Sequence, residues 1–379
     1  MKQIAFSGTL DPITNGHMWV IGEARSLADE VTIFLSENTQ KKPQFSAEER
    51  KRIIESSAAE KGWNNVHVVI VKGDYTARVA KKRGIDYIIR GIRNTSDFDY
   101  ENLIQQTNVD VLHGAKTIFV MPPRDLGSVS SSFVRTLQGP VGWHWNIKKF
   151  VPGPAYRAWI LDWLHKEWDS LWEPQNQAQA DNAEQWFARL TGPDAYGGTD
   201  RHYHNLDHLV HGLTEIGVWT RRINASTADT NTLKKAFWFH DAVYAHAQGG
   251  VSDEEASAQL WLQSKLDDPD VQGVVALIRA TDHFQGPAIT HSLKNVMLGA
   301  DLAILGQDEE VYDAYAQAIR REYSQVPDAE YRNKRRAALA HLCDKAKAGD
   351  LFPEPYFVEY YEAAALANMA REITALGDV

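Results

Sequence analysis

Cysteine is almost absent from this sequence, and long apolar runs are absent altogether. Cys343 is the only cysteine among 379 residues, so no disulfide can form within the chain, as is typical of proteins in a reducing compartment. No run stays apolar for long enough to cross a bilayer, and there is neither an internal repeat nor a low-complexity tract. The first residues enter an apolar pattern at once, so we expect no targeting leader. The sequence therefore predicts a cytoplasmic protein with no membrane partner.

The balance of charge changes along the chain, whose formal net charge is -10. Residues 1–152 contain 20 Lys and Arg against 16 Asp and Glu, which gives +4, and residues 153–379 contain 20 against 34, which gives -14. A mildly basic first half suits anionic, phosphorylated ligands, whereas an acidic second half argues against a nucleic-acid partner. A chain of this length is also too long for one ordinary core, so we expect two domains.

Short apolar runs alternate with helical patterns over the first 140 residues. Strands are expected at 3–7, 31–36, 66–71, 87–91 and 117–121, and helices near 17–28, 46–60, 76–83 and 98–113, with a last one from residue 131. This alternation predicts a parallel sheet with right-handed crossovers. The ligand crevice of such a sheet lies beyond the carboxyl ends of its strands.

A cluster of glycines and prolines at 138–154 interrupts this pattern and predicts a domain boundary. Ten of the 12 tryptophans follow residue 140, so the composition changes there as well. Beyond the boundary the pattern is helical, with almost no sign of strands. We expect helices over 155–172, 178–190, 204–221, 231–245, 252–266, 270–282, 308–323, 330–347 and 356–375.

The stretch Gly8–His17 reads Gly-Thr-Leu-Asp-Pro-Ile-Thr-Asn-Gly-His and joins the first expected strand to the first helix. Free main-chain N–H groups and the partial positive charge of the helix start suit a phosphate at such a junction. The His17 imidazole can donate a hydrogen bond to a phosphoryl oxygen as negative charge develops. Alone, the pattern is about as typical of a tight turn as of a phosphate site, so the functional interpretation needs a second motif.

Three hydroxyls and a cation at another expected helix start supply that second motif. Ser130–Ser132 followed by Arg135, together with Thr14-x-Gly16-His17, resembles the two signatures of the nucleotidylyltransferase superfamily. Within that superfamily, the chain up to about residue 152 resembles the phosphopantetheine adenylyltransferase family. The segments that match it are Gly8–His17, Lys41-Lys42-Pro43, Arg90-Gly91-Ile92-Arg93, Asp97–Glu101 and Ser130–Ser132.

This resemblance implies adenylyl transfer from ATP to 4′-phosphopantetheine, giving dephospho-coenzyme A and pyrophosphate, with Mg²⁺ as cofactor. It implies that Thr9 and His17 stabilise the pentavalent transition state and that Lys41 and Arg90 hold the acceptor phosphate. It further implies that Arg93 and the serine run bind the triphosphate and that Glu101 lies on the adenosine side. The residues predicted to bind substrate or ATP are Gly8, Thr9, His17, Lys41, Thr76, Arg90, Gly91, Arg93, Glu101, Ser130, Ser131 and Ser132. The family forms hexamers, so a homo-oligomer is expected.

Three positions depart from the family pattern. Leu10 stands where the family usually has Phe, Trp19 stands where it has Asp, and residues 125–128 lack the aromatic residues that often precede the serine run. The phosphate-binding residues are unaffected by these changes, but the pockets for the acceptor and the adenine are. Nucleotidyl transfer to another phosphorylated acceptor therefore stays open as an alternative.

The second half carries its own set of histidines and aspartates. On a helix, His204, His208 and His211 would share one face, His240-Asp241 follows an aromatic run, and Asp301 stands among apolar residues. A carboxylate in apolar surroundings needs a partner or a metal. Imidazoles and carboxylates together form a ligand set for a divalent metal, which can activate water.

The text around these residues resembles the HD-domain metal-dependent phosphohydrolases, over roughly residues 155–379. That resemblance implies His204 as the general acid and His208, His240, Asp241 and Asp301 as ligands of Mn²⁺, Mg²⁺ or Fe²⁺. The division of roles between His204 and His208 stays open, and His283 and Glu254 are candidates for a second metal. HD domains also occur as ligand sensors, so a non-catalytic sensing module is the alternative. Together the two resemblances imply a Rossmann-like α/β domain, residues 1–152, followed by an all-α HD domain, residues 155–379.

Overall fold

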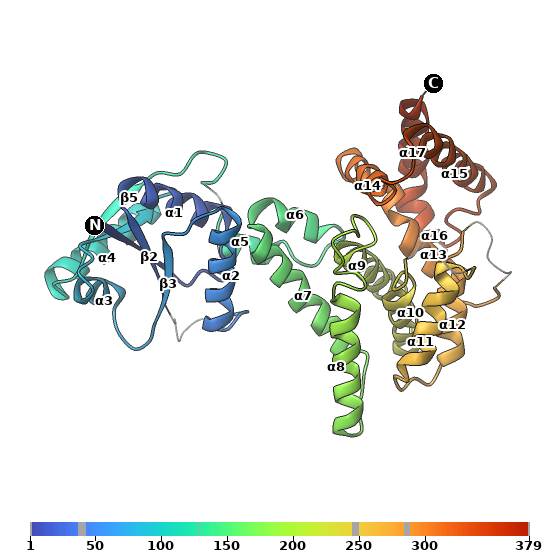
Figure 1. The fold of residues 1–379 in the computed structure, drawn as a ribbon, viewed down its shortest axis with the longest axis horizontal. Helices are drawn as coiled ribbons and strands as arrows, with labels where there is room; N and C mark the ends of the chain where they lie inside the picture. Colours follow the sequence, from blue (N-terminus) through green and yellow to red (C-terminus); the bar gives the residue numbers. More distant parts are fainter. Residues whose placement is uncertain (1, 37–42, 128, 245–249, 284–288, 378–379) are drawn as a thin grey trace. The chain divides into compact units, whose positions relative to one another are not determined.

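The computed structural model describes residues 2–36, 43–127, 129–244, 250–283 and 289–377. The chain divides into two compact units, Met1–Ile160 and Leu161–Val379 (Figure 1). The first unit contains a β-sheet with flanking helices, and the second is built from helices. Within the described ranges, none of the helices combines the length and the apolar character that a membrane crossing requires.

Five parallel strands form the sheet of the first unit, in the order β3-β2-β1-β4-β5. The strands are β1 (Gln3–Gly8), β2 (Glu30–Ser36), β3 (Val66–Val71), β4 (Tyr87–Gly91) and β5 (Lys116–Val120). The chain adds strands on one side of β1 as far as β3, and then returns to the other side with β4. The crevice of such a sheet opens at this switch point, beyond the carboxyl ends of β1 and β4. The predicted parallel α/β fold is thus confirmed.

The helices of this unit bury the apolar sheet. They are α1 (Asn15–Leu27), α2 (Ala47–Glu60), α3 (Thr76–Lys82), α4 (Thr95–Gln106) and α5 (Ser131–Thr136), with a π-helical turn at Thr107–Val111. Helix α1 contacts β1, β2 and β4. Ala5, Ile33 and Ile89, on the three central strands, are fully buried. Strands that are covered on both faces read as continuous apolar runs, which is why the sequence identified them.

One helix lies in the segment that the glycines and prolines had marked as a break. Helix α6 (Trp143–Phe150) follows Gly142, whose φ of 76° is in the left-handed region that favours glycine, and buries Trp143 and Ile147. Helix α7 (Gly153–Asp169) then places Trp159 against Phe45, and the Trp159 indole N–H donates to Gln138 at 2.8 Å. These contacts attach the segment to the first unit, which ends at Ile160.

Helices of unequal length form the second unit. They are α8 (Gln177–Thr191), α9 (Leu206–Ile223), α10 (Thr227–Phe239), α11 (Asp253–Ser264), α12 (Val271–Ala280), α13 (Lys294–Leu302), α14 (Glu309–Glu322), α15 (Asp328–Ala348), α16 (Pro355–Phe357) and α17 (Ala363–Leu376), with a 3₁₀ turn at Ala303–Gly306 and a π-helical turn at Val358–Glu362. Helix α10 contacts α9, α12 and α13, and α13 also contacts α9. The helices that carry His208 and Asp301 and the helix that ends just before His240 are therefore neighbours.

Two differences from the predicted helices affect the site. The helix expected from residue 204 begins at Leu206, because the Asn205 side chain accepts a hydrogen bond from the main-chain N–H of Asp207 and caps it. His204 therefore lies before the helix and does not share a face with His208. Helix α13, which carries Asp301, was not predicted, because Gly299 stands within its nine residues and a glycine weakens a helical pattern.

Candidate functional site

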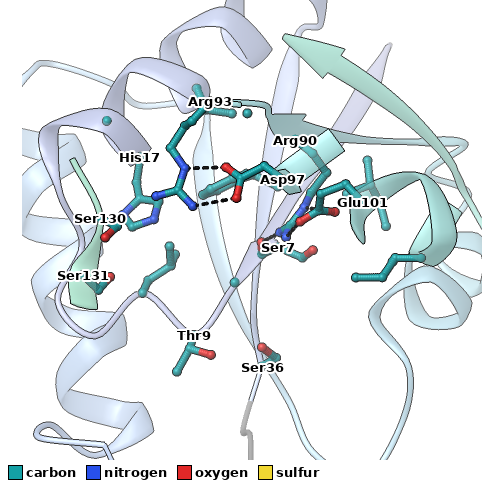
Figure 2. A pocket seen from close by; sticks show the side chains of 18 of the residues that line it. Ser7, Thr9, His17, Ser36, Arg90, Arg93, Asp97, Glu101, Ser130 and Ser131 are labelled. Carbon is teal, nitrogen blue, oxygen red and sulfur yellow. Dashed lines mark hydrogen bonds and ion pairs between the residues drawn. The ribbon is translucent and has the colours of Figure 1, made fainter. Parts of the chain in front are cut away.

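A cavity of about 830 Å³ opens at the carboxyl ends of β1 and β4, where the strand order reverses. Its walls also include the starts of α1 and α5 and part of α4 (Figure 2). The predicted residues that line it are Gly8, Thr9, His17, Thr76, Arg90, Gly91, Arg93, Glu101, Ser130, Ser131 and Ser132. Lys41 lies outside the described residues. Segments that are far apart in the sequence thus meet in one cavity, at the edge of the sheet where a ligand crevice was expected.

The start of α1 fixes the orientation of His17. The main-chain N–H of Thr14 donates to Nδ1 of His17 at 3.1 Å, while the Thr14 hydroxyl accepts from the main-chain N–H of His17. Because Nδ1 accepts a hydrogen bond, the single proton of a neutral imidazole must be on Nε2. Burial, together with the charges of Arg90 and Arg93, lowers the pKa of His17 to about 4. At neutral pH the ring is therefore uncharged and carries an N–H donor.

Two arginines in the cavity are each held by a carboxylate of α4. Nε and Nη2 of Arg90 both donate to the carboxylate of Glu101, and Nη1 donates to the main-chain carbonyl of Ser7. Arg93 donates to Asp97 from Nε at 2.6 Å and from Nη2 at 3.1 Å (Figure 2). The carboxylates fix both guanidinium planes and offset part of the positive charge. Glu101, expected on the adenosine side, is a direct partner of Arg90.

The loop between β1 and α1 is held by side-chain contacts that sequence reasoning did not predict. Arg50 of α2 donates to the main-chain carbonyl of Thr9 at 2.5 Å, and the buried carboxylate of Asp11 accepts from the main-chain N–H groups of Gln44 and Phe45. From α5, Arg135 donates to the main-chain carbonyl of Asp11. The local pattern did not predict these roles of Arg50 and Asp11, because the contacts described here join residues more than 30 positions apart.

The serines at the start of α5 make different hydrogen bonds. The Ser130 side chain accepts from the main-chain N–H of Phe133 at 3.2 Å and caps α5, and the Ser131 hydroxyl donates to the main-chain carbonyl of Pro12 at 2.7 Å. Both serines therefore support the local structure while they line the cavity. Of the two residues that depart from the family pattern, Leu10 lines the cavity, whereas Trp19 is not among the described residues that line it.

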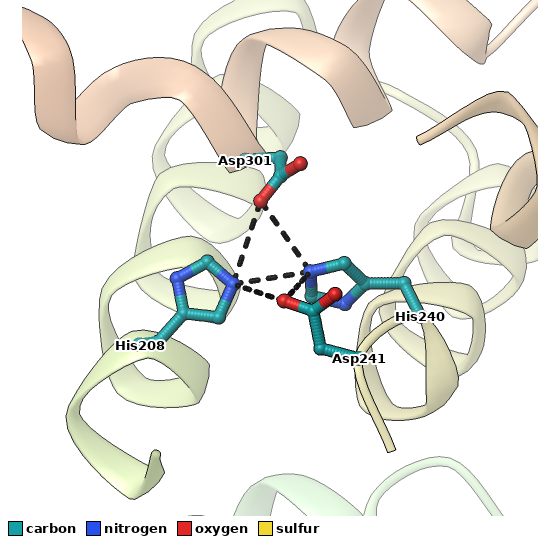
Figure 3. Close-up of side chains that lie close together, drawn as sticks. All are labelled: His208, His240, Asp241 and Asp301. Atoms are coloured by element: carbon teal, nitrogen blue, oxygen red, sulfur yellow. Dashed lines mark hydrogen bonds and ion pairs between the residues drawn. The ribbon is translucent and has the colours of Figure 1, made fainter. Parts of the chain in front are cut away.

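A second constellation lies in the helical unit, where four predicted metal ligands meet (Figure 3). His208 comes from α9, His240 and Asp241 directly follow α10, and Asp301 comes from α13. Nε2 of His208 lies 3.0 Å from Nε2 of His240, and both nitrogens lie 3.4 Å from Oδ1 of Asp301. Oδ2 of Asp241 lies 3.1 Å from Nε2 of His240 and 3.4 Å from that of His208.

These separations suit a metal ion. Ligand atoms about 2.0–2.2 Å from a cation, at ordinary coordination angles, lie about 3.0–3.5 Å from one another. Nδ1 of His240 is 2.8 Å from the main-chain carbonyl of Phe237 and so carries the proton, which leaves Nε2 free to coordinate. Nδ1 of His208 is buried without a hydrogen-bond partner among the described residues. Two imidazoles and two carboxylates are hard-to-borderline ligands that suit Mn²⁺, Fe²⁺, Zn²⁺ or Mg²⁺.

The charges of this cluster compensate one another. Burial acts to lower the pKa of His240, but the carboxylates of Asp241 and Asp301 outweigh it and hold that pKa well above its usual value. Burial lowers the pKa of His208, and the neighbouring imidazoles keep the pKa values of both aspartates below their usual range. A divalent cation would take the place of the proton that His240 otherwise holds.

His204 lies beside the cluster and not in it. Its Nε2 is 3.9 Å from Oδ2 of Asp241, and its Nδ1 is 2.8 Å from Oε2 of Glu322. Burial acts to lower the pKa of His204, but Asp241 and Glu322 raise it above its usual value. This position separates the predicted acid, His204, from the predicted ligand, His208.

The candidates for a second metal have other surroundings. Nε2 of His283 is 2.9 Å from Oδ2 of Asp301, so His283 orients the Asp301 carboxylate. Among the described residues, neither His283 nor Glu254 joins a group of three or more possible ligands. Such a group does occur at His165, Asp169 and Glu184, but it is largely exposed, as acidic surface clusters commonly are.

Comparison with known proteins bears on the first unit. Residues 5–137 match the cytidylyltransferase-like family. Phosphopantetheine adenylyltransferase from Chromobacterium violaceum is 36% identical over 160 residues, which are 42% of this chain and 96% of that protein. The enzymes of the same name from Neisseria meningitidis serogroup C and Lacticaseibacillus paracasei are 31% and 36% identical, over 44% and 41% of this chain and 96% and 92% of their own lengths. Through its N-terminal region, the chain belongs to the phosphopantetheine adenylyltransferase family.

Proposed function

We propose that the first unit transfers an adenylyl group from ATP to 4′-phosphopantetheine and releases dephospho-coenzyme A and pyrophosphate. The observation that carries this proposal is the meeting of His17, Arg90, Arg93 and the serine run in one cavity at the switch point of the sheet. The relatives' name, phosphopantetheine adenylyltransferase, supports the choice of substrates.

The reaction needs positioning and charge stabilisation more than proton transfer. An oxygen of the acceptor phosphate, already ionised, forms a bond to the α-phosphorus of ATP while the bond from that phosphorus to the pyrophosphate oxygen breaks. Negative charge grows on the α-phosphoryl oxygens and on the leaving pyrophosphate. No base is required, because the nucleophile carries no proton that must be removed.

The neutral His17 donates from Nε2 to an α-phosphoryl oxygen, and the Thr9 hydroxyl assists it. Arg90 and Lys41 hold the acceptor phosphate, and Arg93 with Ser130–Ser132 holds the triphosphate. The guanidinium groups start in fixed planes, because Glu101 and Asp97 hold them, so little side-chain entropy is lost when the phosphates bind.

Magnesium fits this site through the nucleotide. The cavity carboxylates Asp11, Asp97 and Glu101 are each bonded to donors of the chain, so triphosphate oxygens and water would be the main ligands of Mg²⁺. When bound there, Mg²⁺ would neutralise charge on the pyrophosphate.

Competition between nucleotides and between acceptors tests the substrates. The full-length protein should release pyrophosphate from ATP and 4′-phosphopantetheine, with CTP a poor substitute and dephosphorylated pantetheine no acceptor. A preference for CTP, or turnover only with a different phosphorylated acceptor, would contradict the proposal and would point to Leu10 as the source of the altered pocket.

For the second unit we propose an HD-type phosphohydrolase centre with His208, His240, Asp241 and Asp301 as metal ligands. The specific observation is the spacing of their donor atoms, because each imidazole Nε2 lies 3.0–3.4 Å from the other imidazole and from one oxygen of each aspartate. A divalent metal bound there would supply Lewis-acid chemistry to a phosphoryl oxygen. His204, beside the cluster, is the group that donates a proton to the leaving oxygen. A related nucleotide or a pantetheine phosphate is the proposed class of substrate.

Phosphate release from a panel of nucleotides and pantetheine phosphates with Mn²⁺, Mg²⁺ or Fe²⁺ tests this second activity. Activity that disappears in His240→Ala supports hydrolysis. Metal binding without any release from the panel would favour the alternative, a sensing module, and altered transferase kinetics in the same variant would show that the module regulates the first unit.

A further inference from the structure

One buried carboxylate organises the segment that carries His204. Glu322, the last residue of α14, is 6% exposed. Its Oε1 accepts hydrogen bonds from the main-chain N–H groups of His202, Tyr203 and His204, at 2.8, 2.7 and 3.0 Å. Its Oε2 lies 2.8 Å from Nδ1 of the His204 ring. Glu322 is 118 residues from His204 in the sequence, so the contact exists only in the folded chain.

We propose that Glu322 is a positioning residue that holds His204 with Nδ1 protonated and Nε2 directed at the metal cluster. This inference rests on the proposed phosphohydrolase centre and adds to it a residue outside the predicted set. A carboxylate is only an acceptor, so the proton of this hydrogen bond must be on Nδ1 of His204. The opposite nitrogen, Nε2, then lies 3.9 Å from Oδ2 of Asp241, on the side where a substrate phosphate would meet the metal.

The arrangement does more than stabilise a turn. A carboxylate that only held the turn would need no imidazole, because the three main-chain N–H groups already bind one of its oxygens. The second oxygen is instead bonded to the ring, so the same side chain fixes the main chain and the ring of His204 together. A ring held in this way needs little reorganisation before it transfers a proton.

The surrounding contacts fix the ring relative to the metal ligands. Arg201 donates to the main-chain carbonyl of His204 at 3.2 Å and to that of Asp241 at 2.6 Å, which ties the His204 segment to the ligand segment. The Tyr244 ring lies against the His204 ring, with 4.2 Å between centroids. Tyr244 thus opposes rotation of the His204 ring, and Glu322 keeps a proton on its Nδ1.

Glu322→Gln is the informative variant. Its amide oxygen can still accept the main-chain N–H groups, so the cradle is kept, but its amide N–H₂ then faces Nδ1 of His204 and can only donate. His204 can then no longer carry a proton on Nδ1, so the imidazolium that Glu322 stabilises, with protons on both nitrogens, is replaced by a neutral ring whose one proton is on Nε2 and which is a weaker acid. Asp268→Asn is the matched control, because the Asp268 carboxylate is also buried, accepts a main-chain N–H from Asp270, and has a charged partner in Lys235.

Two measurements on the full-length protein test the proposal. With Mn²⁺ and p-nitrophenyl phosphate as the probe, Glu322→Gln should lower kcat about 10- to 100-fold and leave KM and Mn²⁺ affinity within about threefold. Nitrogen NMR of the histidine rings, with Zn²⁺ present, should show a protonated Nδ1 on His204 in the wild type and an unprotonated Nδ1 in the variant. Asp268→Asn should change neither kcat nor the His204 signals.

The two readouts separate this inference from the proposed function. If the wild type does not hydrolyse the probe, the proposed hydrolase fails, while the ring signal still decides the role of Glu322. An unchanged His204 signal in Glu322→Gln overturns the positioning role. Equal kcat in wild type and variant also overturns it, whereas an equal loss in Asp268→Asn would assign the effect to folding alone.

Discussion

The imidazole of His17 owes its orientation and its charge state to neighbouring residues. Thr14 donates to Nδ1, and burial with two arginines keeps the pKa near 4, so the ring is a neutral donor at physiological pH. His17→Ala removes this donor from the α-phosphoryl group. We expect kcat for adenylyl transfer to fall about 10²- to 10³-fold, with a much smaller change in KM for ATP. Steady-state pyrophosphate release measures both quantities.

The rates of the wild type and of His17→Ala, compared over a range of pH, test the charge state of the His17 imidazole. Because the folded pKa lies near 4 and not near 6.5, His17 is deprotonated at every pH above about 5.5. The ratio of wild-type to His17→Ala rates should therefore stay constant between about pH 6 and pH 8.5. A ratio that rises as the pH falls through 6.5 would show that a charged imidazole is the active form.

At the proposed metal site we expect a loss of metal affinity that does not depend on which substrate the unit takes. His240→Ala removes one of the four proposed ligand atoms and takes away an imidazole that lies 3.1 Å from the Asp241 carboxylate and 3.4 Å from that of Asp301. Mn²⁺ affinity should fall at least about 100-fold, as measured by calorimetry or by the metal content of the purified protein. His165→Ala, in the exposed cluster, serves as the control and should keep the wild-type affinity.

Single residues also show where sequence reasoning reached its limit. His208, His240, Asp241 and Asp301 were predicted because distinctive neighbours surround each of them, and the structure brings them together. Glu322 could not be assigned a role, since a carboxylate at the end of a helix looks like any solvated charge until its partners are known. Its partners depend on the packing of α14 against a segment 118 residues away.

Residues at the helix starts of the first unit also stabilise their helices, a role that the serine motif alone does not reveal. Ser130 caps α5, so Ser130→Ala should lower the free energy of unfolding of that unit by about 1 kcal/mol. Ser130→Asp should restore most of this loss, because Asp is an equally good cap. Ser130→Asp should nevertheless raise KM for ATP several-fold, since the added carboxylate would repel the negatively charged triphosphate. Urea unfolding and initial rates measure the two effects.

A Ser130→Asp variant with normal KM would reduce Ser130 to a cap and would remove it from the triphosphate site. Failure of Asp to restore stability would instead show that the serine hydroxyl has a partner that a carboxylate cannot replace.

The strands and most helices were predictable as elements, whereas α6 and α13 were not. All five strands were expected within a residue or so of their observed ends, because buried parallel strands are continuous apolar runs. Helix α6 was missed because Gly139, Pro140 and Gly142 read as a linker, although Gly142 is the residue that turns the chain into the helix. The start of α9 was misplaced because Asn205 acts as its cap.

On the scale of the whole molecule, the chain combines two compact units, and the first extends past the predicted boundary to Ile160. Trp143, Ile147 and Trp159 are each at most 1% exposed. A fragment that ends at residue 140 would lose all three, at about 1.5–3 kcal/mol for each buried side chain, against a total stability of about 5–15 kcal/mol. We expect this fragment to unfold or aggregate.

A fragment of residues 1–169, which keeps α7 whole, is the control and should fold with a cooperative thermal transition and retain adenylyl transfer. Circular dichroism with thermal melting compares the two fragments. A stable, active 1–140 fragment would show that α6 and α7 are dispensable for the first unit.

The most direct test of the central claim is mass spectrometry of the products that the full-length protein makes from ATP, 4′-phosphopantetheine and Mg²⁺. We predict dephospho-coenzyme A and pyrophosphate in equal amounts, formed at a wild-type rate by His240→Ala and at a rate about 10²- to 10³-fold lower by His17→Ala. If the wild type forms no dephospho-coenzyme A, or if His17→Ala forms it as fast as the wild type, the proposed activity of the first unit is wrong.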